Sequence, residues 1–163
     1  MKAYFDRLRE FAREQNLELV EAFEDVRAQV LAGRTAAARE ALTRWRALLD
    51  RHVKWEEGEV LAAYERRCSP QDRYGARELV DEHRSIARMG ADLTALLDGA
   101  VAGDAVSLRE LVDDIDATLL EHRVREENEV CLALDHALDA RTIERIEEAC
   151  PELPEESLRK PAA

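Results

Sequence analysis

The sequence predicts an all-α protein, an antiparallel up-down-up-down four-helix bundle with a short fifth C-terminal helix. Apolar residues recur at steps of three and four over four long stretches, as they do on the buried face of a helix. Only six glycines and four prolines occur in 163 residues, of which 46% are hydrophobic. Short turns separate the four stretches, and helices joined by short turns pack as antiparallel neighbours.

The first helix is predicted to end at Gly33, because glycine commonly follows a helix C-terminus. The second helix then starts at Thr35, whose hydroxyl can cap it, and ends near Arg67. The apolar stripe of the first helix comprises Phe5, Leu8, Ala12, Leu19, Phe23, Val26 and Val30. The inner stripe of the second helix comprises Leu42, Trp45, Leu49, His52, Glu56, Val60 and Ala63.

The third helix is predicted to start within residues 69–72, Ser-Pro-Gln-Asp, and to end at Asp98-Gly99. The spacing of Ser107 and Glu110 indicates a capping box inside or at the start of the fourth helix, which continues to about Leu138. A short fifth helix follows over about 142–150. We expect one domain over 1–150 and a disordered tail over 151–163, which is rich in proline and glutamate. The inner line of the third helix comprises Leu79, His83, Ile86, Gly90, Leu93 and Leu97.

A repeated run links the second and fourth helices. Residues 52–60, HVKWEEGEV, recur at 122–130 as HRVREENEV, and the same offset aligns Leu49 with Leu119. The two helix pairs therefore look like copies related by a pseudo-two-fold axis. Residues four apart share a helix face, so each run directs a histidine and a glutamate to one side.

These polar residues interrupt apolar stripes and are predicted to form a metal site. Imidazole nitrogen together with carboxylate oxygen suits iron, manganese or zinc, and two such faces in a bundle can enclose two ions. At about 1.5 Å per residue, the three histidines lie at one depth, about 25 Å from the turn that bounds each helix. A metal-free polar layer is the alternative, although buried unpaired carboxylates cost several kcal/mol each. The candidate ligands are His52, Glu56, His83, His122 and Glu126.

At these residues the chain resembles the hemerythrin-like (HHE) cation-binding family over about residues 3–138. The family pattern is a histidine on the first helix, HxxxE on the second, a histidine on the third, and HxxxE or a close variant on the fourth. The resemblance implies a non-haem di-iron centre, bridged by the two glutamates and an oxo or hydroxo group. It also implies oxygen, peroxide or nitric oxide as a ligand.

The first helix departs from the family pattern, since it contains no histidine. Asn16 is the best match to the missing ligand, because the apolar stripe after it repeats the offsets that follow His83. The ungapped repeat instead pairs His83 with Arg13. Asn16 or Gln15 is predicted either to coordinate through its amide oxygen, to hold a metal-bound water, or to play an ordinary polar role.

The third helix has Ala87 where five-histidine oxygen carriers have a second histidine, so reversible oxygen carriage of that type is not expected. Glu59 and Glu129 are candidates to replace the lost donors, and solvated positions at the ends of the same faces are an equal interpretation. Glu57 and Glu127 are expected to face solvent or a helix boundary. The fourth histidine, His136, is expected to be an ordinary residue near a helix end.

Composition excludes other function classes. A net charge of −12 and a pI of about 4.9 disfavour nucleic acid and anionic membrane surfaces as partners. The charged N-terminus lacks a signal-like apolar run, and a cytoplasmic location is expected. Three cysteines without a Cys-x-x-Cys pair indicate buried or half-buried thiols. The oligomeric state is left open.

Three functional hypotheses follow. The first is a cytoplasmic di-iron protein that binds or senses oxygen, nitric oxide, peroxide or iron. The second is a di-iron enzyme that decomposes peroxide or activates oxygen, which the histidine-poor, carboxylate-rich ligand set favours. The third is a metal-free helical interaction module.

Overall fold

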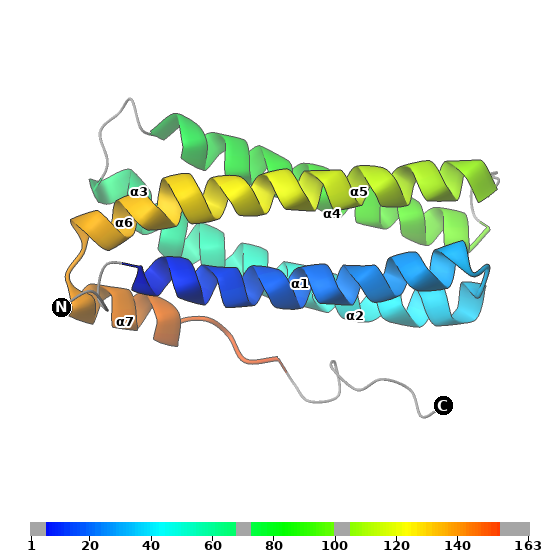
Figure 1. The fold of residues 1–163 in the computed structure, drawn as a ribbon, viewed down its shortest axis with the longest axis horizontal. Helices are drawn as coiled ribbons and strands as arrows, with labels where there is room; N and C mark the ends of the chain where they lie inside the picture. The colour runs from blue at the N-terminus through cyan, green and yellow to red at the C-terminus, as the bar shows by residue number, and fades with distance from the viewer. Residues whose placement is uncertain (1–5, 68–72, 100–104, 154–163) are drawn as a thin grey trace.

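The computed structural model describes residues 6–67, 73–99 and 105–153, without the side chains of residues 73 and 74. Four long helical rods run along the long axis of the molecule (Figure 1). The first hairpin pairs α1 (Arg7–Leu31) with the rod that begins with α2 (Thr35–Trp55). The second pairs α4 (Arg73–Leu97) with the rod that begins with α5 (Ala105–Arg125). Neighbours contact in the ring order α1, α2, α4, α5, which confirms the predicted all-α up-down-up-down bundle.

Two rods contain a π-helical turn that the sequence analysis did not predict. The second rod continues as η1 (Glu56–Leu61) and α3 (Ala62–Arg67), and the fourth continues as η2 (Glu126–Cys131) and α6 (Leu132–Ala137). Both π segments begin at a glutamate of the repeated run. Short π segments inside α-helices are rare and are frequently found at functional sites.

The turns agree in part with the predicted helix ends. Gly33 and Gly99 follow α1 and α4 with φ of +68° and +67°, a left-handed conformation that favours glycine. The prediction that Thr35 caps the second helix is wrong, because Arg34 occupies the N-cap position and no side-chain cap bond forms there. The predicted helix start at 69–72 lies outside the described residues. Ser107 and Glu110 lie inside α5.

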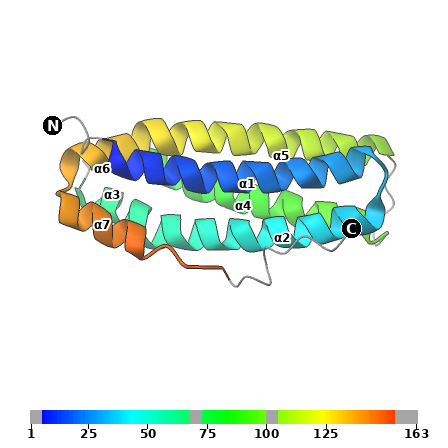
Figure 2. The ribbon, with the colours of Figure 1, turned by 60° about the horizontal axis from the view of Figure 1, so that its bottom comes forward.

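The predicted fifth helix is α7 (Ala140–Glu148), which lies beside the start of α1 at one end of the bundle (Figure 2). The chain then runs back along the bundle, and Leu153 packs against the core. The predicted disordered tail lies outside the described residues from 154 onward. Cys131 and Cys150 are free thiols, the first buried and the second half-buried, whereas Cys68 is outside the described residues.

The core consists of two apolar clusters separated by a polar layer. One cluster contains Leu49, Ile86 and Leu119. The other contains Trp55, Leu79 and Val130. Each candidate histidine lies between a member of one cluster and a member of the other along its own helix. The polar layer is therefore enclosed by apolar side chains on both sides.

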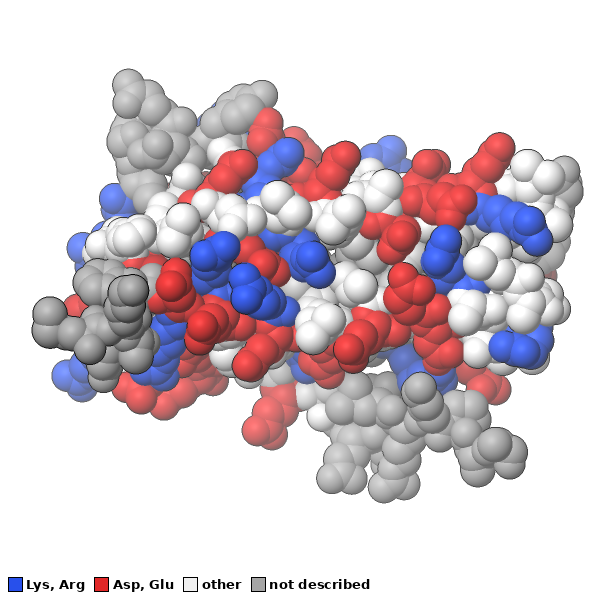
Figure 3. All heavy atoms as spheres, in the orientation of Figure 1, with Lys and Arg blue, Asp and Glu red and all other residues white. Residues whose placement is uncertain are grey.

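The surface carries the mixed charge that the sequence predicts. On the face drawn in Figure 3, acidic side chains are numerous and basic side chains are interspersed among them. None of the helices in the described part of the chain is long and apolar enough to cross a membrane.

Candidate metal centre

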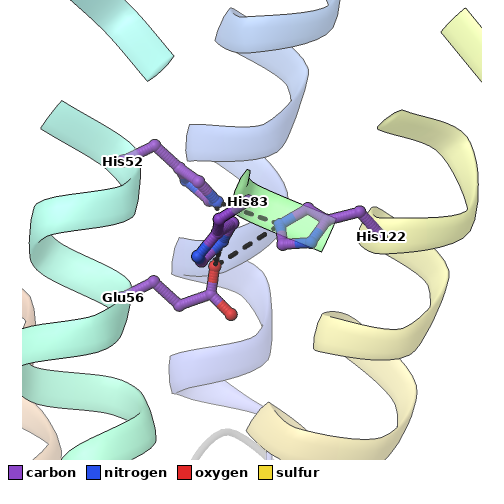
Figure 4. A group of neighbouring side chains, drawn as sticks. All are labelled: His52, Glu56, His83 and His122. Atoms are coloured by element: carbon purple, nitrogen blue, oxygen red, sulfur yellow. Dashed lines mark hydrogen bonds and ion pairs between the residues drawn. The ribbon is translucent and has the colours of Figure 1, made fainter. Parts of the chain in front are cut away.

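Four of the predicted ligands converge in the polar layer. His52 comes from α2, His83 from α4 and His122 from α5, while Glu56 is the first residue of η1. One ligand atom of each lies within 4.8 Å of the others. All four side chains are buried and point toward one another (Figure 4).

The Oε2 atom of Glu56 lies at the centre of this group. It is 2.8 Å from Nε2 of His83, 3.1 Å from Nε2 of His52 and 3.4 Å from Nε2 of His122. The Nε2 atoms of His52 and His122 are 3.3 Å apart. Ligands bound to one ion at about 2.1 Å lie about 3.0–3.4 Å from one another in octahedral or tetrahedral geometry. Four of the six distances among these donors are thus close to the spacing of a single coordination sphere.

The donor set also contains buried atoms that need a partner. Oε1 of Glu56 and Nδ1 of His52 are buried without a hydrogen bond to any described residue. Leaving such an atom unsatisfied costs about 1–3 kcal/mol, and more when the group is charged. A cation bound by the Glu56 carboxylate would offset part of this cost, so the residues fit a metal ion.

Two further carboxylates orient the imidazoles. Nδ1 of His83 lies 2.9 Å from Oε1 of Glu57. Nδ1 of His122 lies 3.3 Å from Oε2 of Glu82, which also forms an ion pair with Arg125. A carboxylate on the outer nitrogen fixes the ring and raises the basicity of the nitrogen that faces the centre.

Sequence reasoning missed these two supporting residues. The sequence predicts that Glu57 faces solvent or a helix boundary; its side chain is 39% exposed, yet its carboxylate reaches His83. Glu82 was not singled out at all. Their positions in the sequence could have indicated both residues, because Glu57 directly follows a candidate ligand and Glu82 directly precedes one.

Glu126 is fully buried at the edge of the group, with Oε2 3.9 Å from Nε2 of His52. Asn16 reaches this edge, as its alignment with the missing histidine predicts. Its amide nitrogen donates a hydrogen bond of 2.5 Å to Oε2 of Glu126. Asn16 therefore contacts a candidate ligand through its donor side rather than through the amide oxygen.

Glu127 was expected to face solvent or a helix boundary, but it is buried. Its carboxylate lies 3.4 Å from Arg13 and 3.8 Å from Arg123. Arg13 is the residue that the ungapped repeat pairs with His83. Asn16 and Arg13 are the two alternative matches on α1. Asn16 thus contacts Glu126, and Arg13 contacts Glu127.

The structure does not bring Glu59 or Glu129 into the group of four. Glu129 is exposed and Glu59 is partly exposed. Both lie within π turns, which are wider than an α turn. Glu59 therefore does not point to the same side as Glu56, nor Glu129 to the same side as Glu126. Val60 and Val130 are fully buried instead. His136 is exposed on α6.

Burial and mutual contacts shift the pKa values of the cluster without metal. Burial alone would raise the pKa of Glu56, but the charge of His122 and hydrogen bonds from all three imidazoles hold it well below its usual value. Burial opposes protonation of His122, but Glu56 and Glu82 raise its pKa to about 10. Burial lowers the pKa of His52. Burial and the Glu56 charge raise the pKa of Glu126 well above its usual value.

The family comparison agrees with this geometry. The model of the hemerythrin HHE cation binding domain matches residues 6–134, which is most of the chain. The chain belongs to the hemerythrin HHE cation-binding family. No curated protein and no solved structure matched it in the other two comparisons. As a member of this family, the HHE domain described here has a buried His/Glu cluster that can hold a metal ion.

Proposed function

We propose that this HHE protein binds non-haem iron in the polar layer and uses it to bind or sense dioxygen, nitric oxide, peroxide or iron itself. The observation that carries the proposal is the convergence of three imidazoles on one buried carboxylate, whose Oε1 atom has no hydrogen bond to the described residues. Imidazole and carboxylate donors suit iron, and manganese or zinc would compete for the same site.

A route for a small ligand supports this proposal. A pocket of about 410 Å³ opens beside the cluster, and His83, Glu57, Val53 and Ala87 are among the residues that line it. Ala87 is small, and it occupies the position at which five-histidine carriers have a second ligand. A diatomic molecule or peroxide could therefore approach the His83 side of the cluster from solvent.

The second candidate is an enzyme that decomposes peroxide or activates oxygen. It is favoured because four protein donors leave coordination positions open beside the pocket. When bound, iron would supply electron transfer and Lewis acidity. The residues of this chain would hold the ion, orient the imidazoles through Glu57 and Glu82, and surround the cluster with apolar groups. Turnover of peroxide, or oxygen uptake that depends on an added substrate, would separate the enzyme from a sensor.

The metal content of variants tests the proposed function. His122→Ala and Glu56→Ala each remove a converging donor, so purified protein loaded with ferrous iron should lose its bound ion. His136→Ala is the matched control, because it removes an exposed histidine outside the cluster. Full occupancy in both cluster variants, or a metal-free protein after growth with added iron, would contradict the proposal. The cytoplasmic location stays a prediction from the sequence.

A further inference from the structure

We infer that the polar layer binds one metal ion, and that side chains of α1 occupy the position that a second ion would need. This inference rests on the proposed metal binding and concerns the number of ions. A bridged pair, which the family resemblance implies, would need donors on both sides of the layer. Only the side formed by α2, α4 and α5 provides them in the described structure.

The pseudo-two-fold repeat makes the two sides directly comparable. On one side, His83 of α4 contacts both members of an acidic pair, at 2.8 Å from Glu56 and 2.9 Å from Glu57. The repeat places Glu126 and Glu127 in the equivalent positions on the other side. There the contacts from α1 are divided between two residues.

Asn16 and Arg13 together replace the single imidazole. Asn16 donates to Glu126 at 2.5 Å, and Arg13 lies 3.4 Å from Glu127. A guanidinium group has no acceptor atom, so Arg13 pairs with Glu127 but cannot itself bind a cation. The amide nitrogen of Asn16 donates to Glu126, so the amide oxygen of Asn16 faces away from this carboxyl group.

The remaining donors on that side are too few for a second ion. Asn16 occupies Oε2 of Glu126, the oxygen that lies 3.9 Å from His52. Glu127 is paired with Arg13 and Arg123. The other oxygens available on that side are Oε1 of Glu126, 4.0 Å from the thiol of Cys131, and the buried Oε1 of Glu127, which has no hydrogen bond to a described residue. Zinc sites in proteins, for comparison, have three or four protein ligands.

Metal counting on the 163-residue chain tests the inference. Metal-free protein would be loaded with excess Mn²⁺, freed of unbound metal by gel filtration, and examined by elemental analysis and electron paramagnetic resonance. The expected result is one ion per chain with the six-line spectrum of an isolated Mn²⁺. Two ions per chain with the multiline spectrum of a coupled pair would overturn the inference and leave the proposed function intact. No bound ion, with either Mn²⁺ or Fe²⁺, would overturn both.

A matched pair of variants tests the same point independently of the count. Glu126→Gln retains an oxygen that can accept from Asn16, so it should bind Mn²⁺ within about threefold of the unmodified protein. Glu56→Gln removes the central charge, and its affinity should fall at least about 100-fold, with the helical circular dichroism spectrum unchanged. A bridging role for Glu126 predicts equal losses in the two variants. Equal losses would therefore overturn the inference.

Discussion

His122 and Glu82 form a contact between α5 and α4, in which Nδ1 of the imidazole lies 3.3 Å from a carboxylate oxygen. Arg125, one turn beyond His122 on α5, pairs with the same carboxylate and also lies 3.2 Å from Glu78. The carboxylate thus joins a candidate ligand to an arginine that holds it in place. The orientation of His122 consequently depends on a residue that does not itself face the metal site.

Removing this carboxylate should weaken metal binding while the bundle remains folded. For Glu82→Ala we expect the metal affinity to fall about 10- to 100-fold, because the imidazole loses the group that fixes its ring and raises its basicity. Titration with Mn²⁺ or Fe²⁺ measures the change. Asp81→Ala is the control, since Asp81 is an exposed neighbour that pairs with Arg84. Equal effects of the two substitutions would contradict the assigned role.

Metal binding should release a proton. Contacts with Glu56 and Glu82 outweigh burial and raise the pKa of His122 to about 10, so this residue is protonated at neutral pH before an ion binds. A cation must displace that proton, and the apparent affinity should rise about tenfold per pH unit from neutral pH toward 10. Calorimetry in buffers of different ionisation enthalpy measures the release, expected to be about one proton per ion. A pH-independent affinity would contradict this prediction.

The metal-free protein should lose stability as the pH rises. Because the folded pKa of His122 is raised, its contribution is fully present below its unfolded value of 6.5 and is lost as the pH rises toward 10. The raised pKa of Glu126 acts in the same direction, since the unfolded chain ionises this carboxyl more readily. Urea unfolding of chelator-treated protein at pH 6.5 and 9.5 measures the difference. Greater stability at pH 9.5 would contradict the prediction.

Asp135 should stabilise the start of α1 from a distant part of the chain. It is a buried residue of α6, and its two carboxylate oxygens accept hydrogen bonds from the backbone nitrogens of Leu8 and Arg9, at 2.9 and 3.0 Å. These nitrogens belong to the first turn of α1, where helix donors lack internal partners. Asp135→Ala should lower the free energy of unfolding by about 2–4 kcal/mol, because buried donors lose a charged acceptor.

The matched control for that substitution is Asp139→Ala. Asp139 is an exposed local cap that accepts from the Thr142 nitrogen at 2.8 Å. Its loss should cost less than the loss of Asp135, because it is an exposed N-cap residue that accepts one backbone hydrogen bond. Urea unfolding measures both variants, and an equal or larger effect at Asp139 would contradict the role assigned to Asp135.

Two glycines should respond oppositely to alanine. A Cβ atom at Gly90 would lie 2.9 Å from a ring carbon of Trp45, which is fully buried and cannot move aside. Gly90→Ala should therefore destabilise the protein by about 1–3 kcal/mol, as overpacking does. Gly58 has no such neighbour within 4 Å among the described residues, so Gly58→Ala should be neutral or stabilise by up to about 1 kcal/mol. Thermal unfolding of both variants checks the contrast.

The sequence by itself determined the helices and the histidine layer. Apolar periodicity and turn glycines are local signals, so the stripes through His52, His83 and His122 and the stops at Gly33 and Gly99 could be identified without coordinates. The repeated His/Glu run similarly predicted that Glu56 and Glu126 face inward, because its spacing matches one helical turn.

Only the tertiary structure decided how those helices share the polar layer. The π turns at Glu56 and Glu126 change the direction in which the following side chains point. Glu59 and Glu129 consequently lie outside the cluster. The contact of Asn16 with Glu126 joins residues that are far apart in sequence, as does that of Asp135 with Leu8. Such pairings depend on how whole helices are placed relative to one another, and the apolar periodicity of a single helix does not predict that placement.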